Sequence, residues 1–405
     1  MTGNETRIVA ACTIGNAVSV TPAVHSVFGL FLLPLSTTFG WTRASISGVL
    51  GLIALIAASA LPFLGRYADR HGARNLVLGG CLLFAAAIAS LAFTNGSLLR
   101  FYLSFGLVAV TGCAASPPIL SKVIAQWFDR NRGSMLGISA GLGGGAGSTV
   151  MPIAAALMMP VLGWRGTYAG IGAIIALAGF PILFLWLKDA PRQRVVEAVT
   201  AGEGSSLSEA IRTKTFWLLI ISLASGAGCL TSIFSHIVPV LAERGISIPI
   251  ATTVISVFGM VGAGWQIAFG AILDRVSSAK ITAPMYLAAA AGLMLLEYGA
   301  STPVLVLAGV ALGIGIGSQF AALPFLVARY FGLRHFGLII GVMYSAVFLL
   351  QGATPVVLDH VFDVQHSYRQ GVTGITLCLA GGAALLLFLP AYRSRALLDQ
   401  PVPVT

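Results

Sequence analysis

Long apolar runs recur throughout the 405-residue chain and restrict what it can fold into. A helix needs about 20 mostly apolar residues to cross a bilayer. Breaking the sequence at polar clusters and at Gly and Pro residues gives a series of runs of this length. They cover roughly residues 8–36, 43–65, 74–94, 98–127, 133–160, 166–187, 215–240, 249–272, 280–299, 303–330, 336–359 and 371–393. The sequence therefore predicts an all-α membrane protein with twelve transmembrane helices.

The composition agrees with a membrane location. Only 9% of the residues are charged and 57% are hydrophobic, whereas a soluble domain has about 25% charged residues. So few charges cannot cover a soluble protein of this size, which excludes a soluble enzyme, a nucleic-acid-binding domain and a disordered chain. A β-barrel is disfavoured because its strands alternate apolar and polar residues over about 10 positions. We expect the chain to lie in a lipid bilayer and to bind no nucleic acid.

Basic residues indicate the orientation of the helices. Cytoplasmic loops of membrane proteins are enriched in Lys and Arg. With a cytoplasmic N-terminus, 18 of the 23 Lys and Arg residues fall on the cytoplasmic side. The five on the outer side are Arg43, Arg100, Arg165, Arg244 and Arg369. We therefore expect a multi-pass protein of the plasma membrane, such as a bacterial inner membrane, with both termini cytoplasmic.

One polar interval divides the predicted helices into two sets of six. Residues 188–214 contain nine charged side chains and predict a cytoplasmic linker, with a short helix around Leu207–Arg212. The predicted organisation is a six-helix bundle over residues 1–187, the linker over 188–214, and a second six-helix bundle over 215–405.

The two halves contain related motifs at a nearly constant offset. Gly65-x-x-x-Asp69-Arg70 and Gly270-x-x-x-Asp274-Arg275 are 205 residues apart. Gly133 and Gly137 correspond to Gly337 and Gly341 at an offset of 204. Parallel repeats of six helices, related by an axis along the membrane normal, are one arrangement found in transporters.

These residues carry a family resemblance. The sequence Gly65-x-x-x-Asp69-Arg70-x-Gly72-x-Arg74 resembles the loop 2–3 signature of the major facilitator superfamily. The stretch from Trp127 to Gly141 resembles the helix 4–5 signature of the monocarboxylate porters, parts of which the related oxalate/formate antiporter branch shares. The resemblance implies a monomeric secondary transporter that moves a small organic anion, here a proton-coupled monocarboxylate symporter using alternating access. It implies no enzymatic activity and no cofactor.

Charged residues near the predicted cytoplasmic helix ends are candidates for a gate. A charge network there would hold the inner side closed when the protein faces outward, and breaking it would shift the population toward inward-facing states. The alternative is that these residues only anchor the topology. The candidate gating residues are Asp69, Arg70, Arg74, Arg130, Arg132, Asp274 and Arg275.

Glycines recur every four residues at the start of the fifth predicted helix, at Gly133, Gly137, Gly141 and Gly145. Small residues at this spacing let two helix backbones approach closely. They predict close packing against another helix, at the interface between the two halves.

Polar side chains inside the predicted spans are candidates for the substrate site, because a charge at the bilayer centre costs several kcal/mol and such groups usually face a cavity. Lys122 has an alternative, since it lies near a helix end and could extend to the interface. The candidates are Asn16, His25, Ser116, Lys122, His236, Trp265, Gln266, Gln319, Tyr344 and Gln351.

His25 is the candidate for proton coupling. His25-Ser26-Val27-Phe28 resembles the helix 1 window of the monocarboxylate porters, in which a lysine is associated with substrate and proton binding. A histidine titrates near neutral pH and could take this role; the alternative is a structural histidine. Helix 8 departs from the porters, because Gln266 stands where they carry a substrate-binding arginine, and Gly262 replaces its acidic partner.

Other functions stay open. Proton-driven efflux of a hydrophobic drug or metabolite is the main rival, disfavoured because Glu297 is the only acidic residue within a predicted span. Anion exchange is a further alternative. A membrane enzyme or receptor is disfavoured, because the spans contain no catalytic carboxylate pair and no nucleophile–base pair. The five cysteines are scattered and have no His at metal-ligand spacing, so we expect no metal site.

Overall fold

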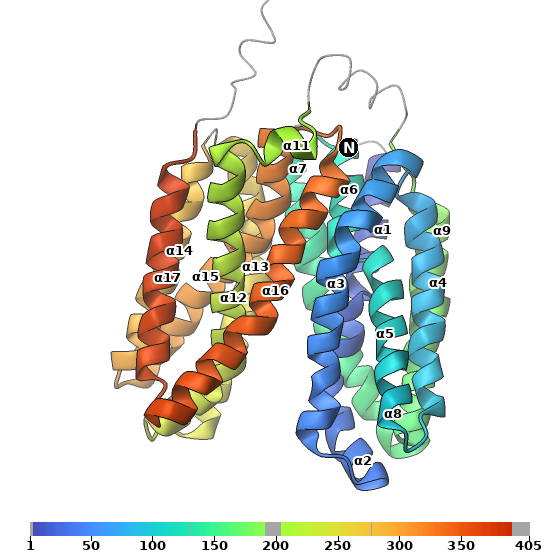
Figure 1. The fold of residues 1–405 in the computed structure, drawn as a ribbon, viewed down its shortest axis with the longest axis vertical. Helices are drawn as coiled ribbons and strands as arrows, with labels where there is room; N and C mark the ends of the chain where they lie inside the picture. Colours follow the sequence, from blue (N-terminus) through green and yellow to red (C-terminus); the bar gives the residue numbers. More distant parts are fainter. Residues whose placement is uncertain (1–2, 130, 191–203, 277, 391–405) are drawn as a thin grey trace, which may run out of the picture.

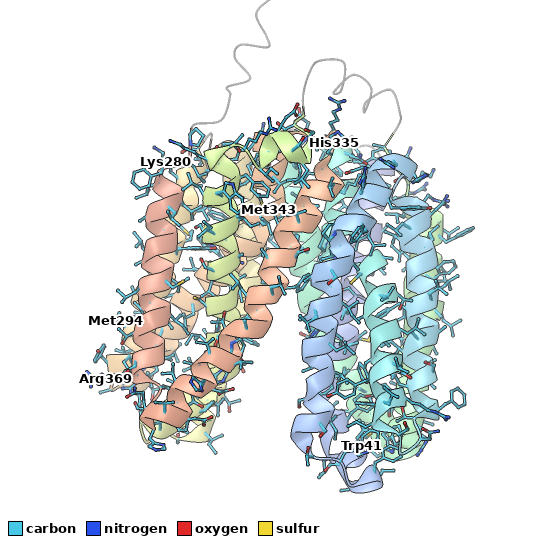
Figure 2. The ribbon with its side chains drawn as sticks, in the orientation of Figure 1. Trp41, Lys280, Met294, His335, Met343 and Arg369 are labelled. Atoms are coloured by element: carbon cyan, nitrogen blue, oxygen red, sulfur yellow. The ribbon has the colours of Figure 1, made fainter. Side chains whose placement is uncertain are left out.

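The computed structural model describes residues 3–129, 131–190, 204–276 and 278–390. Figure 1 shows two groups of steep helices, one built from the first half of the sequence and one from the second. Their ribbons lie close together at the end that carries the N-terminus and α11, and they diverge toward the other end. We call these the linker end and the divergent end. Lys280 and His335 lie at the linker end, and Trp41 and Arg369 lie at the divergent end (Figure 2).

The first half contains six crossings, several of them interrupted. Its helices are α1 (Gly3–Ala17), η1 (Thr21–His25), α2 (Phe28–Phe39), α3 (Arg43–His71), α4 (Arg74–Ser90), η2 (Leu91–Phe93), α5 (Leu98–Ala114), α6 (Pro117–Trp127), α7 (Arg132–Gly137), η3 (Ile138–Leu142), α8 (Gly143–Ile174), η4 (Ile175–Gly179) and α9 (Phe180–Trp186).

The second half is more regular. After the short α11 (Leu207–Ala210), its helices are α12 (Lys214–Glu243), α13 (Ile248–Arg275), η5 (Ala279–Ile281), α14 (Thr282–Tyr298), α15 (Thr302–Phe331), α16 (Phe336–Gln365) and α17 (Arg369–Leu387). The helix α11 begins with a capping box between Ser206 and Glu209, which satisfies backbone N–H groups of its first turn. It lies within the segment predicted to form a short helix.

Within the described residues, eleven helical stretches are long and apolar enough to cross a membrane. The longest, Arg132–Trp186, has 55 residues, or about 80 Å at 1.5 Å per residue. That is more than twice the thickness of a hydrocarbon core, which is about 30 Å. Gly163 breaks this stretch with a φ of 63°, so it contains two crossings, as predicted. The all-α membrane fold is therefore confirmed.

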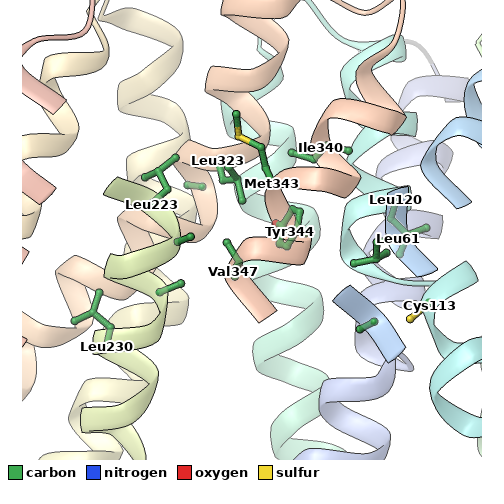
Figure 3. Packing of buried hydrophobic residues seen from close by; sticks show 14 of the residues in the cluster. Leu61, Cys113, Leu120, Leu223, Leu230, Leu323, Ile340, Met343, Tyr344 and Val347 are labelled. Atoms are coloured by element: carbon green, nitrogen blue, oxygen red, sulfur yellow. The ribbon is translucent and has the colours of Figure 1, made fainter. Parts of the chain in front are cut away.

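The apolar core continues from one half into the other at mid-height. In Figure 3, Met343, Tyr344 and Val347 of α16 lie between Leu223 of α12 and Leu61 of α3. All five side chains are buried. The helix α16 therefore packs on its own half and on the opposite half.

Candidate functional site

A buried ion pair lies at the linker end of α3. The Asp69 carboxylate is 3.0 Å from the Lys122 ammonium, and both side chains are almost fully buried. The same carboxylate accepts hydrogen bonds from the backbone N–H groups of Gly337 and Leu338, each at 2.9 Å. These groups belong to the first turn of α16, where unpaired N–H groups and the helix dipole favour an anion. Asp69 thus joins a lysine of its own half to a helix of the other half.

The second half repeats this arrangement. The Asp274 carboxylate, at the end of α13, accepts hydrogen bonds from the backbone N–H groups of Gly133 and Ser134, each at 2.7 Å. The Ser134 hydroxyl adds a third bond at 2.6 Å. These residues form the first turn of α7 in the first half. The repeated motif therefore places one carboxylate from each half on a helix N-terminus of the other.

Glycines allow the helix backbones to meet beside these carboxylates. A Cβ at Gly65 would collide with the carbonyl oxygen of Gly337, and a Cβ at Gly137 would lie 2.6 Å from the carbonyl oxygen of Gln266. Gly141 is packed against Ala263 in the same way, at 2.9 Å. The close packing predicted from the glycine spacing is confirmed, and the partner helix of α7 is α13 of the opposite half.

No ion pair joins Asp69 or Asp274 to a predicted gating arginine among the described residues. Arg74 donates to the carbonyl oxygens of Leu187 and Phe184 within the first half. Arg132 is buried and donates to the Phe128 carbonyl. Arg70 and Arg275 are exposed, and Arg130 lies outside the described residues. The ion-pair partner of Asp69 is Lys122, which the sequence placed among the substrate candidates.

The first crossing is interrupted near its middle, where it carries two candidates. The helix α1 ends at Ala17, and the π-helix η1 runs from Thr21 to His25. Asn16, which is 3% exposed, donates to the backbone and side-chain oxygens of Ser139 in η3, at 3.1 and 2.9 Å. Its Oδ1 has no hydrogen-bond partner among the described residues. His25, the last residue of η1, is exposed.

Three interruptions of the first half adjoin one another. Asn16 bonds to the π-helix of the fifth crossing, and a Cβ at Gly112 of α5 would collide with Val20 in the break of the first crossing. The fourth crossing breaks one turn later, at Ser116, whose hydroxyl donates to the Cys113 carbonyl. Irregular backbone inside a membrane is tolerated where it is buried in protein or lines a cavity, and π-helical turns are frequent at functional sites.

Polar candidates of the second half lie between α13 and α15. Trp265 donates to the Ser318 hydroxyl at 2.8 Å. Gln319 is 1% exposed; it donates to the Leu223 carbonyl and accepts from the Tyr286 hydroxyl. Gln319 therefore connects helices inside its own half. Gln266 is buried on the face of α13 that meets the first half.

The remaining candidates lie between α12 and α16. His236 contacts Asp359, with its Nε2 2.8 Å from the carboxylate Oδ1. Gln351 donates to the Thr231 hydroxyl at 3.0 Å. Tyr344 is buried on α16. The ten candidates therefore do not form one cluster, because they divide between the two halves and Lys122 pairs with Asp69.

The sequence analysis paired neither of the substrate candidates Lys122 and His236 with a carboxylate. Both are partners of another titratable side chain. The available signal was that a lone charge inside an apolar run needs a partner, since an unpaired buried charge is strongly disfavoured. The partner itself lies 53 residues away in one case and 123 in the other.

A hollow of about 410 Å³ opens between α1, η3 and α9. Its lining is almost entirely apolar and includes Val9, Ile14, Leu142 and Trp186. It belongs to the first half alone and therefore differs from a cavity between the halves.

Known proteins with similar sequences and folds are membrane transporters. The sequence model of the Major Facilitator Superfamily matches residues 14–355. Monocarboxylate transporter 11 of Homo sapiens is 27% identical over 250 residues, which cover 61% of this chain and 52% of that protein. The chain thus matches about half the length of this relative. The 4-hydroxybenzoate transporter PcaK of Pseudomonas putida is 24% identical over 372 residues, covering 79% of this chain and 81% of that protein.

The fold leads to the same family. The solved structure of the proton:xylose symporter XylE superposes with a TM-score of 0.74 at 14% identity and covers 96% of both chains. This identity supports a shared fold and nothing about the transported solute. Because the family model covers most of the sequence and the folds agree along the chain, the protein belongs to the Major Facilitator Superfamily of transporters and is not an enzyme.

Proposed function

We propose that the protein is a secondary transporter that moves a small monocarboxylate together with a proton by alternating access. The observation that carries this proposal is which of the candidate cations already has a carboxylate partner. Lys122 and His236 each pair with a carboxylate. His25 has no ion-pair partner among the described residues, and it is exposed at the break of the first crossing. Its ring makes a hydrogen bond with the backbone of Val20, and we infer that it is the cation that binds the anion.

Protonation of His25 would couple the transport of the proton to the transport of the monocarboxylate. An imidazolium supplies the positive charge that Gln266 lacks in the eighth crossing, since an amide provides only neutral hydrogen bonds. Proton binding then increases the affinity for the anion, and the bound anion in turn increases the affinity for the proton.

The linker end is the cytoplasmic side in this proposal, because basic residues gather there under the positive-inside rule. The halves meet at that end and diverge at the other (Figure 1), which corresponds to an outward-facing state. Asp69 and Asp274 stabilise this state through their hydrogen bonds to helices of the opposite half.

Two relatives bear on the substrate class, because one is named for monocarboxylates and the other for 4-hydroxybenzoate. Aromatic acids therefore join aliphatic ones as candidates. Trp265 and Tyr344 are the aromatic members of the candidate set, and the ring of an aromatic acid would stack on them.

The test uses purified protein in proteoliposomes. A panel of radiolabelled aliphatic monocarboxylates and 4-hydroxybenzoate is supplied outside, with and without an inward proton gradient. We expect at least one acid to accumulate only when the gradient is present. A neutral sugar and a dicarboxylate serve as matched controls. Accumulation of no acid under any gradient, or equal accumulation without one, would contradict proton-coupled uptake and favour efflux or exchange.

A further inference from the structure

Two cysteines of the second half contact each other inside the membrane. Cys229 belongs to α12 and Cys378 to α17, and their thiols share a hydrogen bond. A disulfide forms between two cysteines only when their side chains point toward each other, as these two do. Neither residue belongs to the gate or to the candidate substrate site.

The packing of α12 on α17 supports this contact independently. The Ser222 hydroxyl of α12 donates to the Gly382 carbonyl oxygen of α17 at 2.7 Å. Ser225, one turn further along α12, lies within hydrogen-bonding distance of the Cys378 sulfur, one turn back along α17. The two helices therefore run antiparallel here, and the next turn of α12 brings Cys229 to the same thiol. Cys378 thus lies against one face of α12, between Ser225 and Cys229.

The contact lies near the middle of the bilayer. Cys378 is nine residues from the start of α17 at Arg369, or about 14 Å along the helix axis. Half the thickness of a hydrocarbon core is about 15 Å. The surroundings of the pair on the outside of the protein are therefore lipid acyl chains and not water.

The two thiols differ in how they can be reached. Cys378 is exposed, whereas Cys229 is buried. Leu377, the residue before Cys378, is 68% exposed, and α17 lies on the side of the second half that is turned away from the first half (Figure 1). A reagent dissolved in the lipid can therefore reach Cys378 directly, and it can act on Cys229 only through Cys378.

We propose that Cys229 and Cys378 form a modification site, at which a hydroperoxide of a lipid acyl chain oxidises the two thiols reversibly to a disulfide. In the first step the Cys378 sulfur attacks the terminal oxygen of the hydroperoxide and the O–O bond breaks. The lipid leaves as an alcohol with the thiol proton, and Cys378 becomes a sulfenic acid. In the second step the Cys229 sulfur attacks the Cys378 sulfur, the S–O bond breaks, and hydroxide leaves with the Cys229 proton as water. The two electrons taken from the thiols reduce one hydroperoxide to the alcohol and water.

The remaining cysteines show why this pair is distinct. Cys12, Cys81 and Cys113 are buried, and thiols buried in apolar surroundings are inert. Cysteines that respond to oxidants are accessible and lie beside a second cysteine, which captures the sulfenic acid before further oxidation. Cys378 meets the first condition, and its contact with Cys229 meets the second.

Oxidation changes how the second half is held together. In the reduced form, the described contacts of α12 with α17 near this depth are hydrogen bonds such as the one from Ser222 to Gly382. The disulfide joins the first crossing of the second half covalently to its last crossing. It therefore restricts any movement of α12 relative to α17 near the bilayer centre.

The test uses full-length protein in lipid nanodiscs, without substrate. One sample contains a phospholipid hydroperoxide in the bilayer, a second receives the same amount of hydrogen peroxide in the water, and a third receives neither. Mass spectrometry after digestion detects peptides joined between Cys229 and Cys378. We expect the joined peptides to form at least about tenfold faster with the lipid hydroperoxide than with hydrogen peroxide, because oxidation follows access to the thiol. Dithiothreitol should reverse the reaction.

Three variants complete the test, and thermal unfolding checks that each is folded. Cys378→Ser should give no joined peptides and leave Cys229 reduced, because Cys229 is buried. Cys229→Ser should allow Cys378 to be oxidised beyond the sulfenic acid, because no second thiol captures it. Cys81→Ser, which removes a buried thiol of the first half, is the control and should behave as the wild type.

Two results would overturn the proposal. The absence of joined peptides in the wild type treated with the lipid hydroperoxide would show that the pair is not oxidised to a disulfide. Equal rates with the two oxidants would show that the site is not reached from the lipid. Neither result depends on whether the protein transports a monocarboxylate.

Discussion

Asp69 is the residue on which the contact between the halves depends most directly. Its carboxylate neutralises the buried Lys122 and accepts two N–H groups of α16 at once. Removing one partner of a buried ion pair costs about 3–5 kcal/mol, because the remaining charge stays buried without compensation. The same change weakens the binding of the α16 N-terminus.

We predict that Asp69→Asn reduces the outward-facing population. Double electron–electron resonance between spin labels across the linker end should show a longer mean distance than in the wild type. Lys280→Gln, which removes an exposed charge at the same end, is the control and should leave the distances unchanged. Equal distance distributions in Asp69→Asn and the wild type would show that this carboxylate does not hold the gate.

A second variant separates the two roles of Asp69. The double variant Asp69→Asn/Lys122→Met removes the uncompensated charge as well. We predict that it recovers most of the thermal stability lost in Asp69→Asn, because no ion remains buried, while the linker end stays loosened. If the distances recover together with the melting temperature, the unpaired charge of Lys122, and not the loss of the helix cap, had opened the linker end.

At the scale of the element, the glycines of α7 show that the contact between the halves is a contact of backbones. A Cβ at Gly137 would lie too close to the Gln266 carbonyl oxygen, whereas a Cβ at Gly144 of α8 would meet nothing within 4 Å. Both are glycines of the same crossing. They therefore form a matched pair of sites at which only one substitution disturbs the interface.

We predict that Gly137→Ala opens the linker end and Gly144→Ala does not. Overpacking of a tight contact costs about 1–3 kcal/mol, and about 1.4 kcal/mol changes an equilibrium tenfold. Cysteine cross-linking across the linker end should therefore slow in Gly137→Ala by about tenfold. Equal cross-linking rates in the two variants would mean that α7 and α13 do not need this close approach.

The sequence predicted these elements well, because hydropathy and glycine spacing are properties of single helices. The twelve runs, the turn near Gly163 and the close packing at Gly137 needed no knowledge of the neighbours. The break after Ala17 was not predicted, since a π-helical segment keeps the same apolar composition as the helix around it. The pairs Lys122–Asp69 and His236–Asp359 were also missed, because they depend on which helices become neighbours in space.

At the scale of the whole molecule, the two motif carboxylates each bind a helix of the opposite half. Asp69 binds the start of α16, and Asp274 binds the start of α7. The halves can separate at the linker end only when both sets of hydrogen bonds are lost. In the proposed alternating-access cycle, we expect both carboxylates to release helix N-termini in the same step, which would make the change between states cooperative.

The central claim is that proton and substrate meet at His25. The most direct measurement is gradient-driven uptake of an accepted monocarboxylate into proteoliposomes across a range of external pH, for the wild type, His25→Ala and His360→Gln. Wild-type affinity should fall as pH rises through the pKa of His25, since the positive charge is lost. In His25→Ala, uptake should drop by about tenfold or more, which corresponds to about 1.4 kcal/mol, and lose this pH dependence. His360→Gln should behave as the wild type. Gradient-driven accumulation in His25→Ala with the wild-type pH profile would contradict the claim.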